Sequence, residues 1–439
     1  MNATALLLAS LLLAAEPGPV PPLPALSAAA AAPAFALARE ACERDGGVLW
    51  GKSLCGPILL IDPVSRQVVA SHGDGEGRLT AQNGVWLGTL PTEVSPANTA
   101  LDWAGVRWIA VLWPLPESPR EQTRLLLHEA FHRIQDQLRL PANQPDNAHL
   151  DGEVGRVWLQ LEWRALLRAY EVGVSSGRKE AFVDALAFRL HRWQLLPEGR
   201  DAEIALEKNE GLAEYTGIVL SGDGGAARLQ VVENLRAAPG KPSFVRSFAY
   251  ASGPAYGLVL DSLRPKWRLE MPNRVIDLGR LLALSLGINA EEWQKLAATA
   301  PERAARYQGA ELMAAERIRA ETRAAQRAEW RARLVTGRVV RLDFRAMNIT
   351  FDPGELVPLE EAGTVYPGTR ITDAWGVLEV TSGGALVASD WSHVRVAAGD
   401  KPRRKGNVWT GSGWRLELAP GWRLVRAKGT GWTVEPEAP

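Results

Sequence analysis

The segment Leu125-Leu126-Leu127-His128-Glu129-Ala130-Phe131-His132 carries two histidines four residues apart, with a glutamate directly after the first. On an α-helix, residues four apart lie on one face, so both imidazoles can turn toward one metal ion while Glu129 reaches the adjoining space. The segment therefore predicts a helix that carries a zinc site. The alternative is a hydrogen-bonded pair of histidines on an ordinary amphipathic helix. Apolar residues recur around the motif at helical spacing and predict a stripe along the edge of a core: Leu127, Ala130, Phe131, Ile134 and Leu138.

A hydrolytic zinc needs a third protein ligand and leaves its fourth position to water. We expect this ligand between Asn209 and Tyr215, where Glu210 and Glu214 lie in a predicted helix from about Asp201 to Ser221. Four glutamates follow one face of this helix and would repel one another unless a cation neutralises them: Glu203, Glu207, Glu210 and Glu214. Gly211 indicates that another backbone comes close to the same helix. We favour Glu210 as the third ligand.

Two other carboxylates are alternative ligands. Glu153 follows His132 much more closely than Glu210 does, within the segment Asp151-Gly152-Glu153-Val154-Gly155-Arg156. Glu162 is a further candidate. The segment Glu153–Tyr170 also reads as a packing helix, on which Glu162 would lie on the wetter side.

Together, His128-Glu129-x-x-His132 and Asn209-Glu210-x-x-x-Glu214 resemble the motifs of the gluzincin metallopeptidases, the group of thermolysin and aminopeptidase N. The resemblance implies a Zn²⁺ ion held by His128, His132 and Glu210. It also implies that Glu214 orients His128, since a ligating imidazole needs its other ring N–H fixed. It covers only these motif residues and the helices that carry them.

Zinc chemistry at this motif would make Glu129 the catalytic base, which takes the proton of a water that attacks a carbonyl group. The resemblance further implies a tyrosine or histidine that donates to the developing oxyanion. Tyr215, Tyr250 and Tyr256 are candidates, and we favour Tyr256 because a predicted helix, Gly257–Leu263, begins directly after it. The alternative is a core tyrosine whose hydroxyl has a structural partner.

Composition places this motif in a large chain with no net charge. Its length of 439 residues predicts two or three domains, its hydrophobic content of 46% is enough for large cores, and its formal net charge is zero. The chain has no basic stripe that could follow phosphates, so a nucleic acid is not an expected partner. We predict an α+β fold with these parts: a signal peptide and tether over residues 1–36, a mostly helical, zincin-like metallohydrolase domain with a small N-terminal sheet over 37–300, a charged connector helix over 301–334, and an all-β module over 335–439.

The N-terminus predicts export. Ala5–Ala15 is an apolar, leucine-rich run that is too short to span a bilayer but suits a signal peptide, so we expect no transmembrane helix in the mature protein. Ala34-Phe35-Ala36 has the form of a cleavage site, and Glu16–Pro33 reads as an unstructured tether. In an exported protein, Cys42 and Cys55 would form a disulfide, whereas in a cytosolic one they would remain thiols.

Short strands are expected before the motif, at Pro57–Ile61, Gln67–Ser71 and Val106–Trp113. Tryptophan-rich strands are expected near the C-terminus, where Gly413-Trp414, Gly421-Trp422 and Gly431-Trp432 form a degenerate repeat that is typical of a meander. The tryptophans either pack between β layers or bind sugars or another cell-wall or protein partner. The predicted strands of this module are Gly376–Thr381, Ala385–Ser389, Trp414–Leu418 and Trp422–Ala427.

The sequence thus favours an exported zinc metallohydrolase that acts on a peptide or protein substrate. The alternative is a non-catalytic envelope protein, in which the helical core is a scaffold and the β module binds a partner.

Overall fold

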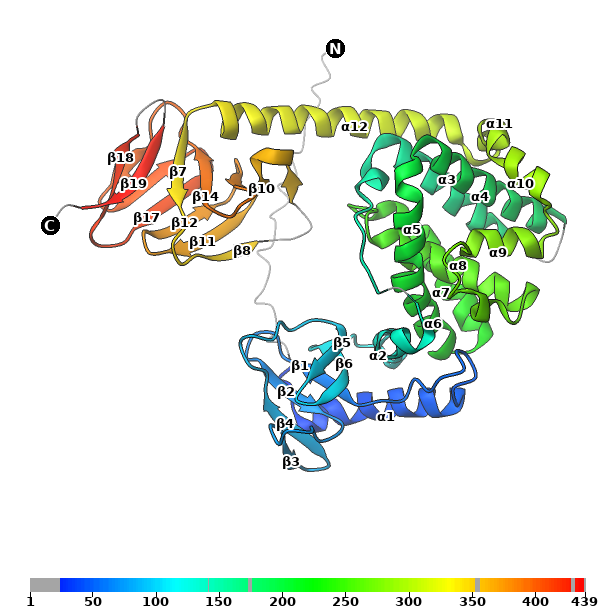
Figure 1. The fold of residues 1–439 in the computed structure, drawn as a ribbon. Helices are drawn as coiled ribbons and strands as arrows, with labels where there is room; N and C mark the ends of the chain where they lie inside the picture. Colours follow the sequence, from blue (N-terminus) through cyan, green and yellow to red (C-terminus); the bar gives the residue numbers. More distant parts are fainter. Residues whose placement is uncertain (1–23, 141, 173–175, 352–355, 428–430, 438–439) are drawn as a thin grey trace, which may run out of the picture. The chain divides into compact units, whose positions relative to one another are not determined.

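The computed structural model describes residues 24–140, 142–172, 176–351, 356–427 and 431–437, and they form two compact units (Figure 1). The first unit holds the described residues up to Asn147, with Glu162–Pro239 and Val245–Ala300. The second holds Ala148–Leu161, Gly240–Phe244 and the described residues from Pro301 onward. The fold is α+β, as predicted, with a small N-terminal sheet, a helical middle and a C-terminal all-β region. Among the described residues, no helix combines the length and the apolar character needed to cross a membrane.

The first helix, α1 (Ala28–Asp45), corrects the predicted unstructured tether over its last residues, from Ala28 to Pro33. Its N-terminus is capped by Ser27, whose hydroxyl accepts a hydrogen bond from the backbone of Ala30 at 3.3 Å. The alanine-rich stretch folds because its small side chains form a buried face, which includes Ala34 and Phe35. The predicted signal segment Ala5–Ala15 lies outside the described residues.

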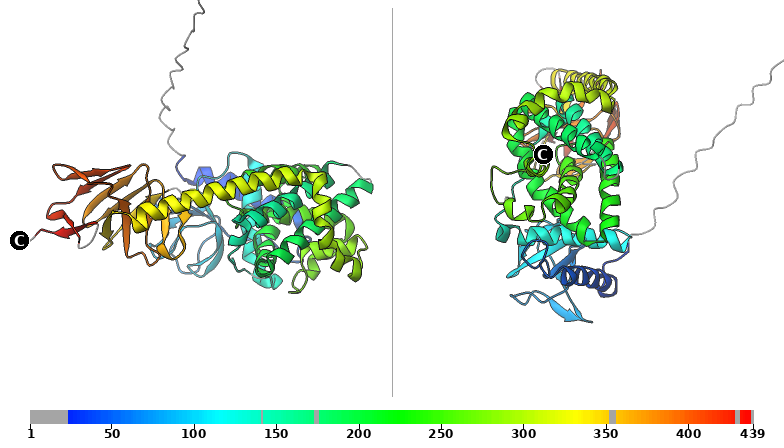
Figure 2. Two further views of the ribbon diagram at one scale, coloured as in Figure 1. Left: turned by 90° about the horizontal axis from the view of Figure 1, so that it is seen from above. Right: turned by 90° about the vertical axis from the view of Figure 1, so that its right-hand side faces the viewer.

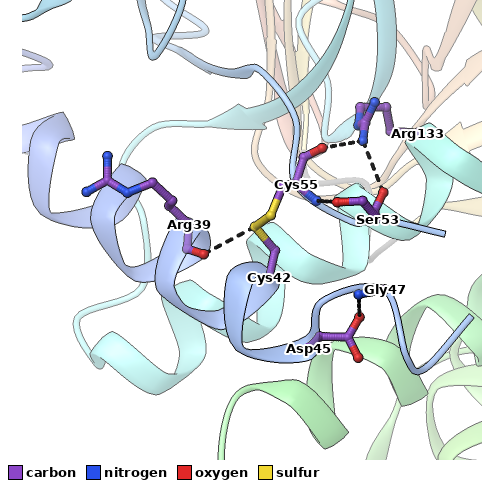
Figure 3. Close-up of a disulfide and its surroundings, with 7 residues drawn as sticks. All are labelled: Arg39, Cys42, Asp45, Gly47, Ser53, Cys55 and Arg133. Carbon is purple, nitrogen blue, oxygen red and sulfur yellow. Dashed lines mark hydrogen bonds between the residues drawn. A yellow bond between two sulfur atoms is a disulfide. The ribbon is translucent and has the colours of Figure 1, made fainter. Parts of the chain in front are cut away.

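A disulfide joins Cys42, near the end of α1, to Cys55 in the following loop (Figure 3). The carbonyl of Cys55 accepts a hydrogen bond from the Arg133 guanidinium at 2.6 Å. Arg133 directly follows the second histidine of the motif and belongs to α2 (Pro119–Ile134). The bridged loop is therefore fixed to the helix that carries the motif.

The N-terminal sheet has six strands in the order β3-β4-β2-β1-β6-β5, and only the β1–β6 pair is parallel. The three predicted strands are present as β1, β2 and β6, with ends that differ by one residue from those expected. Helices α1 and α2 lie side by side next to this sheet (Figures 1 and 2). The strands are β1 (Ile58–Ile61), β2 (Gln67–Ala70), β3 (Thr80–Gln82), β4 (Val85–Thr89), β5 (Thr99–Trp103) and β6 (Val106–Leu112).

The helical middle supplies the elements that pack against α2. The predicted helix from Asp201 to Ser221 is present as three consecutive segments: α5 (Arg200–Leu206), a π-helical turn η4 (Glu207–Gly211) and α6 (Leu212–Leu220). The other principal helices are α3 (Glu153–Glu171), α4 (Ser176–Leu195), α7 (Gly224–Ala237), α8 (Ser247–Leu263), α9 (Leu278–Ser285) and α10 (Ala290–Leu296).

Helix α8 begins ten residues earlier than the predicted helix at Gly257–Leu263 and contains Pro254 in its interior. A proline has no N–H to give to the carbonyl four residues before it, here that of Tyr250. The Asn234 side-chain amide donates to this carbonyl instead, at 3.2 Å. The helix can therefore continue through the proline because Asn234 of α7 satisfies the free carbonyl, and local sequence does not reveal this contact.

Three glycines let the backbones around the motif come unusually close. A Cβ on Gly253 of α8 would lie 2.4 Å from the Cα of Gly211 in η4, and one on Gly217 of α6 would lie 2.4 Å from the carbonyl oxygen of Arg124 in α2. Both distances are too short for any other residue, so these positions require glycine. The predicted role of Gly211 is confirmed, and η4 and α6 are held tightly between α8 and α2.

In the second unit, the predicted long helix over 301–334 is interrupted. It consists of α11 (Ala300–Ala304), a 3₁₀ turn η8 (Ala305–Tyr307), α12 (Gly309–Arg331) and a π-helical turn η9 (Ala332–Thr336). Gln308 has a left-handed backbone with φ of 55°, which ends the first segment. Within this unit, Glu316 of α12 accepts hydrogen bonds from Arg156 at 2.9 Å and Gln160 at 2.7 Å.

The all-β module is a sandwich of a seven-stranded and a six-stranded sheet, ordered β18-β19-β7-β14-β13-β10-β9 and β15-β16-β17-β12-β11-β8. Residues of both sheets form one buried core that includes Trp375 and Trp414, so these tryptophans pack between layers. The predicted meander is wrong, because β17 pairs with β12 and β16 whereas β18 pairs with β19 in the other sheet. The strands are β7 (Val339–Asp343), β8 (Asn348–Phe351), β9 (Val357–Pro358), β10 (Thr364–Tyr366), β11 (Thr369–Asp373), β12 (Gly376–Val380), β13 (Ala385–Val387), β14 (His393–Ala397), β15 (Arg403–Lys405), β16 (Val408–Gly411), β17 (Trp414–Leu418), β18 (Trp422–Arg426) and β19 (Trp432–Pro436).

Candidate metal centre

His128, His132 and Glu210 converge in the first unit. One ligand atom from each of these side chains can be chosen so that all three atoms lie within 4.8 Å of one another. The two Nε2 atoms are 3.2 Å apart, and Glu210 Oε2 lies 3.4 Å from that of His128 and 3.8 Å from that of His132. Among the described residues, no other group of three or more histidine, cysteine, aspartate or glutamate side chains is arranged to hold a metal ion. The structure therefore brings together the three ligands expected from the sequence.

The charges around His128 favour a cation at this point. Burial alone would lower the pKa of His128, but the carboxylates of Glu210 and Glu214 outweigh it and raise the pKa to about 10. Burial likewise opposes ionisation of Glu210, yet its hydrogen bonds with both histidines and Tyr250 hold the pKa of this carboxyl far below its usual range. A concentrated negative charge among buried side chains attracts either a proton or a metal ion.

Glu214 lies where the resemblance places it, next to His128. Its Oε2 is 3.2 Å from His128 Nδ1, and its Oε1 accepts from the Arg124 guanidinium at 2.5 Å. Arg124 stands one turn before His128 on α2, so its charge offsets that of Glu214. The close packing at Gly217 brings α6 near enough for this contact. The Nδ1 atom of His128 is thereby held by a fixed acceptor, which leaves Nε2 for a ligand.

His132 is oriented by a residue that the sequence analysis did not select. Its Nδ1 lies 2.8 Å from Gln135 Oε1, and the Gln135 amide donates to Asn209 Oδ1 at 3.0 Å. Gln135 is fully buried and follows His132 by three residues. Helical spacing could have identified it, because residues three apart are neighbours on a helix.

Glu129 is buried beside the histidines, and its Oε2 atom has no hydrogen-bond partner. Burial raises the pKa of Glu129, while the nearby histidines oppose this shift. A buried carboxylate oxygen with no partner is costly and is retained where it has a chemical role. Its free lone pairs can accept a proton from a water held at the cluster.

The tyrosine at the cluster is Tyr250, not the favoured Tyr256. The Tyr250 hydroxyl donates to Glu210 Oε2 at 2.6 Å, and its ring stacks on that of His128 with an interplanar angle of 9°. Tyr256 is fully buried and donates to Glu162 at 2.8 Å, so it has the structural role that we weighed as the alternative. Tyr215 is also buried and donates to Asp261. Tyr250 was among the three candidates, but Tyr256 was favoured because the helix was expected to begin only at Gly257, whereas α8 begins at Ser247.

The predicted stripe of four glutamates separates into two pairs. Glu210 and Glu214 face α2, whereas Glu203 and Glu207 accept hydrogen bonds from two buried arginines, Arg192 and Arg189. The π-helical turn η4 explains the separation, because its extra residue shifts the angular register between the two pairs. Only the second pair of glutamates is left to face a metal ion.

Glu162 and Glu153 lie outside the cluster. The prediction that Glu162 faces solvent is wrong: it is fully buried and accepts from Arg189 at 2.8 Å and Arg192 at 2.7 Å. Glu153 is exposed at the start of α3, in the segment that belongs to the second unit. Neither carboxylate is part of the His128, His132 and Glu210 group.

The buried arginine network predicts a pH dependence of stability through Glu207. Burial outweighs the attraction of Arg189 and raises the pKa of Glu207 from 4.5 to about 7. The folded protein thus keeps a proton that the unfolded chain releases above about pH 4.5, so this stabilising contribution is lost as the pH rises through 7. We expect the free energy of unfolding to fall between pH 5 and pH 8 by on the order of 2 kcal/mol more in the wild type than in Glu207→Gln.

Urea unfolding at the two pH values measures this difference. Glu171→Gln serves as the matched control, since Glu171 is about half exposed and pairs with Arg236 at the surface. Equal pH dependence in the wild type and in Glu207→Gln would contradict the assignment.

The exposed side of the cluster carries two further polar residues, Gln144 and Arg246. Gln144 Nε2 donates to Glu210 Oε1 at 3.3 Å, and Arg246 Nη2 lies 3.4 Å from the same oxygen. Arg246 also donates to the Gln144 side chain. More than half of the Arg246 side chain, 54%, is exposed. No sequence pattern predicts that Gln144 and Arg246 lie at the cluster, because each is outside a helix or strand and reaches the cluster only through the tertiary fold.

Comparison of the chain with protein-family models, with curated proteins and with solved structures gave no match.

Proposed function

We propose that this protein is a zinc-dependent hydrolase that acts on peptide or protein substrates. The observation that carries the proposal is the convergence of His128, His132 and Glu210 beside Glu129, whose Oε2 is buried and unpaired. Two imidazoles and one carboxylate are a ligand set that catalytic zinc sites use, and three protein ligands leave one position for water or substrate. The excess of negative charge at the cluster fits the same ion.

Zinc, when bound, would supply a Lewis acid that makes water acidic near neutral pH and stabilises negative charge on a carbonyl oxygen. His128, His132 and Glu210 would hold the ion. Glu214 and Gln135 would keep the two imidazoles in the tautomer and orientation that direct Nε2 toward it.

Glu129 would accept the proton of the attacking water and pass it to the leaving amine. Its raised pKa suits the first step, because a carboxylate with a higher pKa is a stronger base toward the proton of water. The Tyr250 hydroxyl lies beside Glu210 and would donate a hydrogen bond to the substrate oxygen that becomes negatively charged.

Metal analysis tests the proposal. We expect about one equivalent of zinc per chain in the purified protein, because three protein ligands at a single cluster hold one ion. Zinc should be absent from a variant with both His128→Ala and His132→Ala. The control is His72→Ala, since His72 lies outside the cluster and its Nδ1 contacts Ser71. A wild-type protein that contains no zinc and takes up none would remove the enzymatic proposal and leave the scaffold alternative.

A further inference from the structure

We propose that Arg246 binds a carboxylate of the substrate on the exposed side of the candidate zinc centre, so that the protein selects anionic peptides. This inference rests on the proposed function and deepens it. Arg246 directly precedes α8, the helix that carries Tyr250, and is thus positioned by the same element as the tyrosine at the cluster.

The contacts of Arg246 engage both Nη atoms but use only two of the five N–H donors of its guanidinium. One Nη atom donates to Gln144, which is exposed, and the other lies 3.4 Å from Glu210 Oε1. That oxygen already receives the amides of Gln144 and Asn209, each at 3.3 Å, so Arg246 adds little to its hydrogen bonding. With 54% of its side chain exposed, Arg246 can accept a further anionic partner.

Charge balance favours such a partner. With a divalent cation at the cluster, Glu210 is neutralised by the ion, and Glu214 is already paired with Arg124 at 2.5 Å. The ion, the three carboxylates of Glu129, Glu210 and Glu214, and the two arginines then leave one positive charge in excess. An anionic substrate would cancel this excess and would be attracted to the site before it binds.

The chemistry of arginine points to a carboxylate. A guanidinium is planar and presents parallel N–H donors that match the two oxygens of a carboxylate, whereas an amide or an amine offers no such match. Peptides carry carboxylates either at the C-terminus or on aspartate and glutamate side chains. Both sources share the chemistry that Arg246 would recognise, and the test must separate them.

The test uses zinc-loaded full-length protein and three libraries of N-acetylated hexapeptides. One library has free C-termini, a second has C-terminal carboxamides, and a third has carboxamides and lacks aspartate and glutamate. Cleavage is followed by mass spectrometry, and binding is measured by affinity selection on zinc-loaded Glu129→Gln protein, which does not depend on catalysis. The zinc content of each sample is measured in parallel.

We expect the wild type to bind and cleave carboxylate-bearing peptides at least about tenfold better than the neutral library. Loss of the preference in the second library would identify the C-terminal carboxylate, and its loss only in the third would identify acidic side chains. Arg246→Gln keeps a polar group beside Gln144 but no charge, and it should abolish the preference while zinc remains bound. Arg246→Lys should retain part of the preference, because it keeps the charge but not the planar donor pair.

The matched control is Arg236→Gln, since Arg236 is 60% exposed and is paired with Glu171 at the surface. Its preference should equal that of the wild type. A zinc-binding protein without a carboxylate preference, or a preference that survives Arg246→Gln, would overturn this inference alone. A protein that takes up no zinc would overturn the proposed function and this inference with it.

Discussion

Replacing Glu129 with glutamine is expected to lower kcat by about 10² to 10⁴ while the protein keeps its zinc. Glutamine has nearly the same shape as glutamate but cannot accept the proton of the attacking water. Because Glu129 is not among the three ligand residues, its loss should leave the ligand set intact. Hydrolysis of a peptide library, zinc content and thermal unfolding, measured on the same preparation, separate these effects.

Two outcomes would contradict this role of Glu129. Unchanged hydrolysis would show that another group is the base, and loss of zinc would show that Glu129 is needed to hold the ion. The matched control is Glu171→Gln, which makes the same chemical change at a surface glutamate that pairs with Arg236. Thermal stability should not fall in Glu129→Gln, since the substitution removes a buried carboxylate whose Oε2 has no partner.

Local sequence was sufficient to predict the elements that carry the candidate site. The two helices around the motif and around Glu210 lie where their sequence patterns indicated, and the strands β1, β2 and β6 lie where β-rich runs next to turn residues indicated. The resemblance to the gluzincin motifs was also sufficient to select Glu214 as the partner of His128. These predictions needed no knowledge of how distant segments pack.

The residues that sequence reasoning missed are those whose role depends on contacts between distant segments. Tyr250 was a candidate but was ranked below Tyr256, because the sequence did not show that α8 extends on both sides of Pro254, where an asparagine from α7 donates to the Tyr250 carbonyl. Glu203 and Glu207 face arginines because a π-helical turn changes the register, and local sequence does not specify such a turn. Arg246 and Gln144 come to the cluster through tertiary packing alone.

The choice between Glu210 and Glu153 also depends on tertiary packing that the sequence does not show. Sequence separation favours Glu153 as the third ligand, since it follows the motif more closely along the chain. The local sequence favours Glu210 as the third ligand, since it lies in an otherwise apolar helix and Glu214 follows it by four residues. The close backbone contact between Gly211 and Gly253 holds Glu210 against α8, and Glu153 is exposed in the other unit. Burial and packing, not separation in sequence, decide which carboxylate can serve as a ligand.

Glu210→Ala is therefore expected to weaken zinc binding by more than about 100-fold, whereas Glu153→Ala should leave it unchanged. The expected loss exceeds the 10- to 100-fold effect typical of residues that only orient a ligand, because Glu210 supplies one of three donor atoms. Glu214→Gln should fall between these two, since it weakens only the contact with His128 Nδ1. Competition with a chelator of known affinity measures all three variants on one scale.

Glu210→Gln distinguishes the loss of a ligand from a general loss of structure. Its amide keeps the size of Glu210 and can still accept from Tyr250, so the fold should be preserved while zinc binding drops, because a neutral oxygen is a much weaker zinc ligand than a carboxylate. If Glu153→Ala weakened zinc binding more than Glu210→Ala or Glu210→Gln, the third ligand would be wrongly assigned. A buried carboxylate that contacts two histidines, a tyrosine and an arginine is expected to give the opposite order.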